Sequence, residues 1–198
     1  SRLAGQLHEG EDLWRFEYDK GWAQASDSFD LAPGLPRKRL EHADGGTMRP
    51  VQWFFDNLLP EELLRQAVSK EAGIKGEDAF ALLQYLGAES AGSLTLLPPG
   101  EELPKASALR DLPYEKLSSR IANLPRLTLS ADAPKRMSLA GAQHKLLVVY
   151  HEGHLYEPEG ATPSTHILKP NHPDTDSYPA SVVNEYLTMR LAKAVGLP

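Results

Sequence analysis

Residues 145–169, KLLVVYHEGHLYEPEGATPSTHILK, contain the clearest strand pattern of the chain. The apolar run 146–150 is followed at 151–153 by His-Glu-Gly, which has the composition of a tight turn, and 154–156 continues the extended pattern. A third short strand is predicted over 165–169. The sequence therefore predicts an antiparallel sheet in this part of the chain.

A helix is predicted directly after this sheet, over 181–195, and Gly196 is a suitable stop. Its apolar residues recur at helical spacing, and we expect seven of them to pack one broad face: Val182, Val183, Tyr186, Leu187, Met189, Leu191 and Ala194.

The first hundred residues predict a second, smaller body. Strands are expected over 3–8 and 13–18, paired through a turn at Glu9-Gly10-Glu11, with a weaker extended segment over 22–31. Helices are expected over 50–57, 61–72 and 77–86, and short strands over 93–97 and 121–129. The predicted class is α+β: a small sheet or barrel-like subdomain with helices over 1–105, then a sheet and helix over 106–198.

Composition excludes several classes of protein. The 198 residues are 41% hydrophobic and 24% charged, with a net charge of −6, which argues against a general polyanion binder. The absence of cysteine excludes disulfides and thiolate chemistry and fits a cytoplasmic protein. No apolar run approaches the roughly 18 residues of a membrane span, so we expect no membrane partner.

A loop of small residues, Ser138-Leu139-Ala140-Gly141-Ala142-Gln143, precedes the first strand of the sheet. Small side chains let successive backbone N–H groups approach an anion, and Lys145 lies at the exit of the loop. An ordinary loop before a hairpin is the alternative interpretation.

Lys169 ends the third predicted strand, where alternation places it on one face with Thr165 and Ile167. A lysine that points inward from a strand is costly unless it meets an anion or a carboxylate. Glu185 follows 16 residues later in the first turns of the predicted helix. A loop, a strand lysine and a helix glutamate occur in this order in protein-kinase N-lobes, where the lysine pairs with nucleotide phosphates. Alternatively, both side chains are solvated.

Several strings resemble the N-terminal part of HipA-like toxin kinases, the Ser/Thr kinases of bacterial toxin–antitoxin pairs. The resemblance covers nearly the whole chain. The segments that carry it are Phe16-Glu17-Tyr18 with Trp22, FFDNLLPE at 54–61, Gly87 with Ala91-Gly92, SLAGAQHK at 138–145, THILKP at 165–170, and Asn184-Glu185.

The resemblance implies an enzyme that binds ATP and Mg²⁺ and phosphorylates Ser or Thr of a protein. It assigns ATP binding to Leu139, Ala140, Gly141, Ala142, Gln143, Lys145 and Lys169, pairing of the lysine to Glu185, and autophosphorylation to Ser138. Phosphate on Ser138 would compete with ATP for the same loop.

The resemblance also implies partners. The block 1–105 matches the subdomain that contacts a helix-turn-helix antitoxin. That antitoxin binds operator DNA, so DNA would be only an indirect partner of this chain. A glutamyl-tRNA synthetase is the expected type of protein substrate.

The catalytic groups of a kinase have no match in the chain. His42-Ala43-Asp44 and His172-Pro173-Asp174 imitate the catalytic loop, but Arg49 and Pro179 stand where Asn is required, and no Asp-Phe-Gly occurs. We therefore expect the catalytic and metal-binding aspartates in a C-lobe outside this chain, and no phosphotransfer by the chain alone.

Two alternative functions remain: a non-catalytic module that docks the antitoxin, and an unrelated α+β domain with a structural loop. Three further features are interpreted as structural. His151 to His154 is expected to form a turn and no metal site, Trp53-Phe54-Phe55 to pack in the core, and Arg37-Lys38-Arg39 to be a solvated loop.

Overall fold

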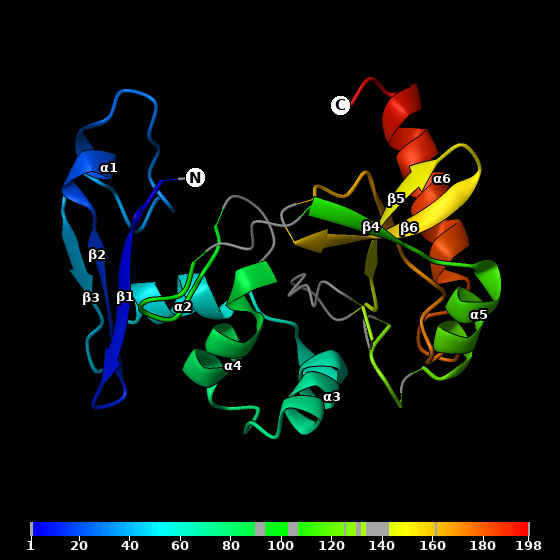
Figure 1. Ribbon diagram of the computed structural model, residues 1–198, viewed down its shortest axis with the longest axis horizontal. Coiled ribbons are helices and arrows are strands. Elements are labelled where there is room, and N and C mark those ends of the chain that lie inside the picture. Colours follow the sequence, from blue (N-terminus) through cyan, green and yellow to red (C-terminus); the bar gives the residue numbers. More distant parts are fainter. Residues whose placement is uncertain are drawn as a thin grey trace. The chain divides into compact units, whose positions relative to one another are not determined.

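The computed structural model describes residues 2–89, 94–102, 107–124, 126–129, 132–133, 143–160 and 162–197. The chain divides into two units, Ser1–Leu58 and Leu59–Pro198. The described residues form two antiparallel sheets, of three and four strands, with helices beside them (Figure 1). The predicted α+β class is confirmed, while the boundary predicted near residue 105 lies outside the described residues and stays a prediction.

The first unit contains the three-stranded sheet, in the order β1-β2-β3. Its elements are β1 (Gly5–Gly10), β2 (Leu13–Tyr18), α1 (Lys20–Gln24), β3 (Glu41–Ala43) and α2 (Pro50–Asp56). The predicted hairpin is present, but Gly10 pairs with Leu13, so the turn consists of Glu11 and Asp12. Both turn residues have positive φ, 54° and 59°. Such a turn matches the twist of the paired strands.

Alternating residues of β2 form the core of this unit. Trp14, Phe16 and Tyr18 are buried, and α2 adds Val51 and Phe55. The Phe16 and Phe55 rings lie 5.6 Å apart. Strand alternation on one side and helical spacing on the other thus bring the aromatic rings together.

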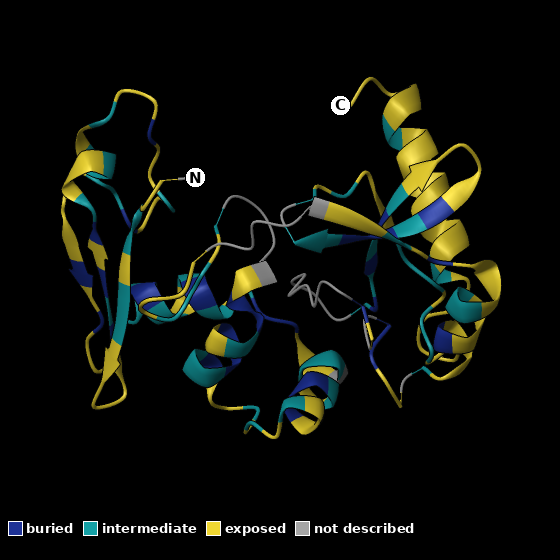
Figure 2. Cartoon of the chain, viewed as in Figure 1, coloured by how far each residue is buried: buried dark blue, intermediate teal, exposed yellow. Residues whose placement is uncertain are grey.

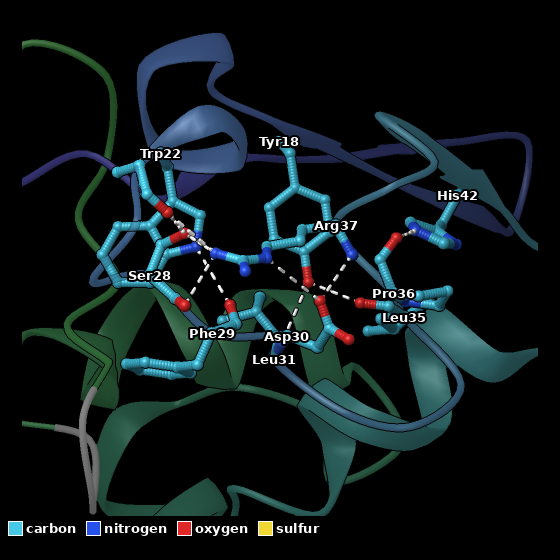
Figure 3. Close-up of polar contacts among 11 residues, drawn as sticks. Tyr18, Trp22, Ser28, Phe29, Asp30, Leu31, Leu35, Pro36, Arg37 and His42 are labelled. Carbon is cyan, nitrogen blue, oxygen red and sulfur yellow. Dashed lines mark hydrogen bonds and ion pairs between the residues drawn. The ribbon is translucent and has the colours of Figure 1, made fainter.

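The connection from β2 to β3 differs from the sequence prediction. The segment 22–31 is not a strand: α1 occupies its start and an irregular loop follows. The Tyr18 hydroxyl donates to the Leu35 carbonyl at 2.5 Å and accepts from the Leu31 amide at 2.9 Å (Figure 3). Burial raises the pKa of this hydroxyl.

Arg37 holds the other side of the same loop (Figure 3). Its guanidinium donates to the carbonyls of Ala25, at 3.0 Å, and Ser28, at 2.7 Å, while its amide donates to Asp30. The solvated-loop interpretation is therefore wrong for Arg37, although Lys38 and Arg39 are exposed. An arginine offers five donors, and here they satisfy loop carbonyls that no strand pairs.

Core packing of the three aromatic residues in α2 is confirmed only in part. Phe55 is buried and Phe54 is half-buried, but Trp53 is 51% exposed. Three consecutive helical residues are about 100° apart, so one apolar face cannot bury all of them.

The second unit contains the four-stranded sheet, in the order β4-β6-β5-β7. Its elements are α3 (Glu62–Ala72), α4 (Ala79–Leu86), η1 (Gly87–Glu89), β4 (Ser107–Asp111), α5 (Tyr114–Ala122), β5 (Leu146–His151), β6 (His154–Gly160), β7 (His166–Leu168) and α6 (Ser181–Ala194). The predicted hairpin, third strand, α3, α4 and α6 are confirmed to within two residues at their ends, apart from the extension of β6 to Gly160.

Two strands expected in this unit are wrong. Residues 94–97 are irregular. Within 121–129, the first two residues belong to α5, and the other described residues, 123–124 and 126–129, form turns and irregular structure, while β4 was not predicted. The Leu96 amide donates to the Gly87 carbonyl at 2.8 Å. A Cβ at Gly87 would lie 2.6 Å from that of Leu96. Close packing on a glycine thus replaces strand pairing at 94–97.

The sheet core and α6 differ sharply in burial. The core is formed by Leu112, Leu129, Ala133, Leu146, Val148 and Leu155. No described residue of α6 is buried, and Figure 2 colours most of the helix as exposed. The expected packed face is wrong, because its large apolar side chains are 40–64% exposed. Helical periodicity shows which face of a helix is apolar, but it does not show whether another element covers that face, and the described residues do not cover this one.

None of the helices in the described part of the chain combines the length and apolar character needed to cross a membrane.

Candidate functional site

The pairing of β5 with β7 brings two lysines to the same end of the sheet. Leu146 pairs with Leu168 in antiparallel register. One step beyond this pair, Lys145 precedes β5 and Lys169 follows β7, so the two residues occupy opposing positions. Opposing positions of an antiparallel pair project from one face. The two ammonium groups therefore lie at the same end of the sheet, close in sequence to Gln143 and to Pro170.

Lys169 forms an ion pair with the helix carboxylate that the sequence singles out. Its Nζ lies 2.5 Å from Oε1 of Glu185, and the two side chains are 32% and 44% exposed. Ion pairs this exposed add about 0–1 kcal/mol to stability. The pair therefore orients the lysine more than it stabilises the fold.

Lys145 is half-buried, and its surroundings are mixed in charge. Burial lowers the pKa of its amine, and the nearby Lys169 ammonium lowers it further, while Glu61 and Glu185 act in the opposite direction. The Lys145 amine thus lies near a second amine, that of Lys169, and near the carboxylates of Glu61 and Glu185. Such a site gains from an added anion, because the anion relieves the repulsion between the amines.

The loop assigned to phosphate is described only at its end. Ser138, Leu139, Ala140, Gly141 and Ala142 lie outside the described residues.

Gln143, the last residue of that loop, is described. Its side-chain amide donates to the Pro170 carbonyl at 3.1 Å. This bond ties the end of the loop to the residue that follows Lys169.

The connection from β7 to α6 is fastened at both of its ends. The side-chain oxygen of Asn171, Oδ1, accepts from the Val182 amide at 3.1 Å, and the Ser181 hydroxyl accepts from the His172 amide at 2.8 Å. Neither side chain was predicted from the sequence. A polar residue at a helix start was the available signal for Ser181, whereas the role of Asn171 depends on tertiary structure.

Glu61 is a third residue that was not predicted from the sequence. It precedes α3 and lies close enough to Lys145 to favour the charged amine. An acidic residue at a helix start is commonly explained by the helix dipole, so its position in the sequence does not point to Lys145.

His144 lies between the loop and β5. It is 4% exposed, and its Nδ1 has no hydrogen-bond partner among the described residues. Burial lowers the pKa of the imidazole, and nearby His172 lowers it further. The neutral ring is therefore the form that fits the fold.

The two sequences that imitate a kinase catalytic loop have local structural roles. The Asp44 carboxylate accepts from the amides of Val51 and Gln52, at 2.8 and 3.0 Å, and so caps α2. Asp174 accepts from the Ser177 amide at 3.1 Å, and this bond lowers the pKa of the carboxyl. Both carboxylates accept hydrogen bonds from backbone amides that follow them in the chain, as in helix caps and Asx turns.

The His151–His154 segment is a hairpin turn, as predicted, with Glu152 and Gly153 at positive φ. Within the described ranges no three His, Asp or Glu side chains come together to hold a metal ion.

Comparison with known proteins identifies the family. Residues 1–97 match the HipA N-terminal domain, and residues 137–198 match the HipA-like C-terminal domain. "Putative kinase Y4mE" of Sinorhizobium fredii is 38% identical over 204 residues, covering 99% of this chain and 47% of the relative. "Serine/threonine-protein kinase toxin HipA" of Shewanella oneidensis is 33% identical over 188 residues, covering 94% of this chain and 40% of the relative.

A solved structure agrees with these matches. The Shewanella oneidensis HipA, HipB and operator DNA complex contains a chain that resembles this one with a TM-score of 0.72 and 32% identity, over 98% of this chain and 44% of that chain. This chain belongs to the HipA family. It spans about half the length of the relatives that it matches, which are kinases or putative kinases and use ATP as their class requires.

Proposed function

We propose that this chain is the nucleotide-binding half of a HipA-type Ser/Thr kinase. In this proposal the loop residues Leu139, Ala140, Gly141, Ala142 and Gln143, with Lys145 and Lys169, bind the ATP phosphates. Glu185 holds Lys169 in place, and Ser138 is the site of autophosphorylation. The observation that carries the proposal is the 2.5 Å contact of Lys169 with Glu185.

The geometry supports phosphate binding in two ways. Lys145 and Lys169 present two ammonium groups from one end of a sheet, and Gln143 ties the loop to the strand end beside them. A triphosphate carries enough negative charge to engage both amines while Glu185 remains paired. An isolated surface lysine would offer neither the carboxylate partner nor the second amine.

ATP is expected to arrive with Mg²⁺, as in the kinase class. We assign no residue of this chain to the metal, because the Asp-Phe-Gly aspartate and the catalytic-loop asparagine that hold Mg²⁺ in kinases have no match in the sequence, and both imitation aspartates are engaged with backbone amides. We expect the chain alone to lack phosphotransfer activity, because the catalytic aspartate has no match either.

The partners proposed are those of a toxin–antitoxin kinase. The related Shewanella structure contains HipB and operator DNA. By analogy, the N-terminal part of this chain, residues 1–105, would contact a helix-turn-helix antitoxin, with DNA reached indirectly. A glutamyl-tRNA synthetase is the proposed type of substrate for the whole kinase.

Nucleotide titration of the 198-residue chain tests the proposal. A fluorescent ATP analogue is titrated into the parent chain, Lys169→Ala and Lys193→Ala. Lys193 is the matched control, because it is an exposed lysine in the last turn of α6. We expect Lys169→Ala to weaken binding at least about tenfold, as loss of a charge-assisted contact does, and Lys193→Ala to bind as the parent does.

Two results would count against the proposal. Equal binding by the parent and Lys169→Ala would remove the phosphate role from Lys169. Absence of binding by every variant would favour the alternative in which this part of the protein acts only as an interaction module.

A further inference from the structure

The position of Glu185 relative to Lys169 depends on the short connection between β7 and α6. Lys169 directly follows β7, and Glu185 lies in the second turn of α6, 16 residues later. The Lys169–Glu185 contact therefore requires the start of α6 to be held against the end of β7.

Two side chains provide that connection. Asn171 accepts from the Val182 amide at 3.1 Å, and Ser181 accepts from the His172 amide at 2.8 Å. In the first bond the helix donates and the segment after β7 accepts. In the second bond the segment after β7 donates and the helix accepts. We call these two bonds the Asn171–Ser181 clamp.

The clamp replaces an ordinary helix cap. The residue before α6, Ala180, has a φ of 50° and supplies no side-chain cap. Asn171 instead satisfies an amide in the first turn of α6 from eleven residues away in sequence. A local cap would satisfy that amide without fixing where the helix lies, whereas a cap from the strand end does both.

α6 has few other restraints among the described residues. None of its residues is buried, so core packing does not fix its rotation or its position along its axis. A small shift of an exposed helix would move Glu185 away from Lys169, because the hydrogen bond between them tolerates only a few tenths of an ångström.

We infer that Asn171 and Ser181 are positioning residues for the nucleotide site. They hold Glu185 where its carboxylate fixes the position of the Lys169 amine. This inference rests on the proposed function for its nucleotide readout. The end of the phosphate loop is fastened at the same place, since Gln143 donates to the carbonyl of Pro170, the neighbour of Asn171. Three consecutive residues, 169–171, thus contact the helix carboxylate, the end of the loop and the start of α6.

Two readouts on the 198-residue chain test this inference. The first is the ¹⁵N NMR signal of the Lys169 ammonium, which exchanges slowly with water only while the ammonium is hydrogen-bonded. The second is the affinity for a fluorescent ATP analogue. The variants are Asn171→Ala and Ser181→Ala, each made singly, with Ser181→Thr as the conservative variant that keeps the acceptor oxygen. Thr188→Ala is the control, since the Thr188 hydroxyl bonds only within α6, to the Asn184 carbonyl.

Both alanine variants of the clamp should lose the slowly exchanging Lys169 signal and bind the nucleotide about tenfold more weakly. Ser181→Thr and Thr188→Ala should retain the signal and bind within about twofold of the parent. A retained Lys169 signal in both alanine variants would overturn the inference, as would an equal loss in Thr188→Ala. If the parent binds no nucleotide, the proposed function fails while the ammonium signal still decides whether the clamp positions Lys169.

Discussion

Glu157 provides the sharpest test of what holds the second unit together. This residue of β6 is 1% exposed and accepts from Arg110 at 3.0 and 2.7 Å and from the guanidinium of Arg120. Lys116 lies 4.0 Å away. Arg120 is itself buried, and its Nε and Nη2 have no partner among the described residues. One carboxylate is therefore the counter-ion of a buried guanidinium.

Glu157→Gln removes the charge and keeps the shape. It leaves the Arg120 guanidinium buried without a counter-charge, which costs about 3–5 kcal/mol of unfolding free energy. For a chain of this size each kcal/mol corresponds to about 2–4 °C, so the melting temperature should fall by about 6–20 °C. Lys116→Met should cost less than about 1 kcal/mol, because that amine is more distant and partly exposed.

Thermal unfolding followed by circular dichroism measures the effect. Glu152→Gln is the matched control: its side chain lies in the β5–β6 turn and is 82% exposed. We expect the control to unfold within about 2 °C of the parent. Equal melting temperatures for Glu157→Gln and Glu152→Gln would show that the buried ion cluster does not stabilise this unit as described.

Three further predictions give separate checks. Asp44→Ala removes the cap of two α2 amides and should cost about 1–2 kcal/mol, seen as a lower urea midpoint with an unchanged slope; an unchanged midpoint would contradict the capping role. Gly5→Ala places a Cβ 2.3 Å from the Glu17 carbonyl oxygen and should cost about 1–3 kcal/mol in the same assay, whereas Gly10→Ala, where a Cβ meets nothing, should cost less. The pKa of His144 is lower in the folded chain than in the unfolded chain. As pH falls below about 6.5, the unfolded chain therefore binds a proton at His144 more readily than the folded chain does, and the free energy of unfolding should fall. His144→Gln should flatten that dependence, and an identical pH profile in the variant would show that another group is responsible.

Local sequence signals predicted the regular elements well where they were reinforced by turns or caps. The β5–β6 hairpin followed from an apolar run and a Glu-Gly turn, and α3 from its acidic start and Gly73, which adopts the left-handed conformation at the helix end. The signals failed where tertiary contacts decide. Arg37 satisfies loop carbonyls that no local pattern reveals, and Leu96 packs on Gly87 instead of pairing as a strand.

The candidate site was predictable in part. The order of Lys169 and Glu185 in the sequence led to a contact that the structure contains at 2.5 Å. Their proposed role in binding phosphate, and that of the loop before them, stays a prediction. Asn171 and Glu61 could not be found from the sequence, because each acts on a residue that is distant along the chain and near only after folding.

Affinity labelling with an acyl-phosphate derivative of ATP tests the central claim most directly. A lysine amine held beside the bound phosphates attacks the acyl carbon, forms an amide and releases ATP, and mass spectrometry then locates the acylated residue. We predict labelling of Lys145 or Lys169 that excess ATP suppresses, with Lys193 and Lys38 labelled only at a background level that ATP does not change. Labelling spread evenly over these four lysines and insensitive to ATP would contradict a nucleotide site at this end of the sheet.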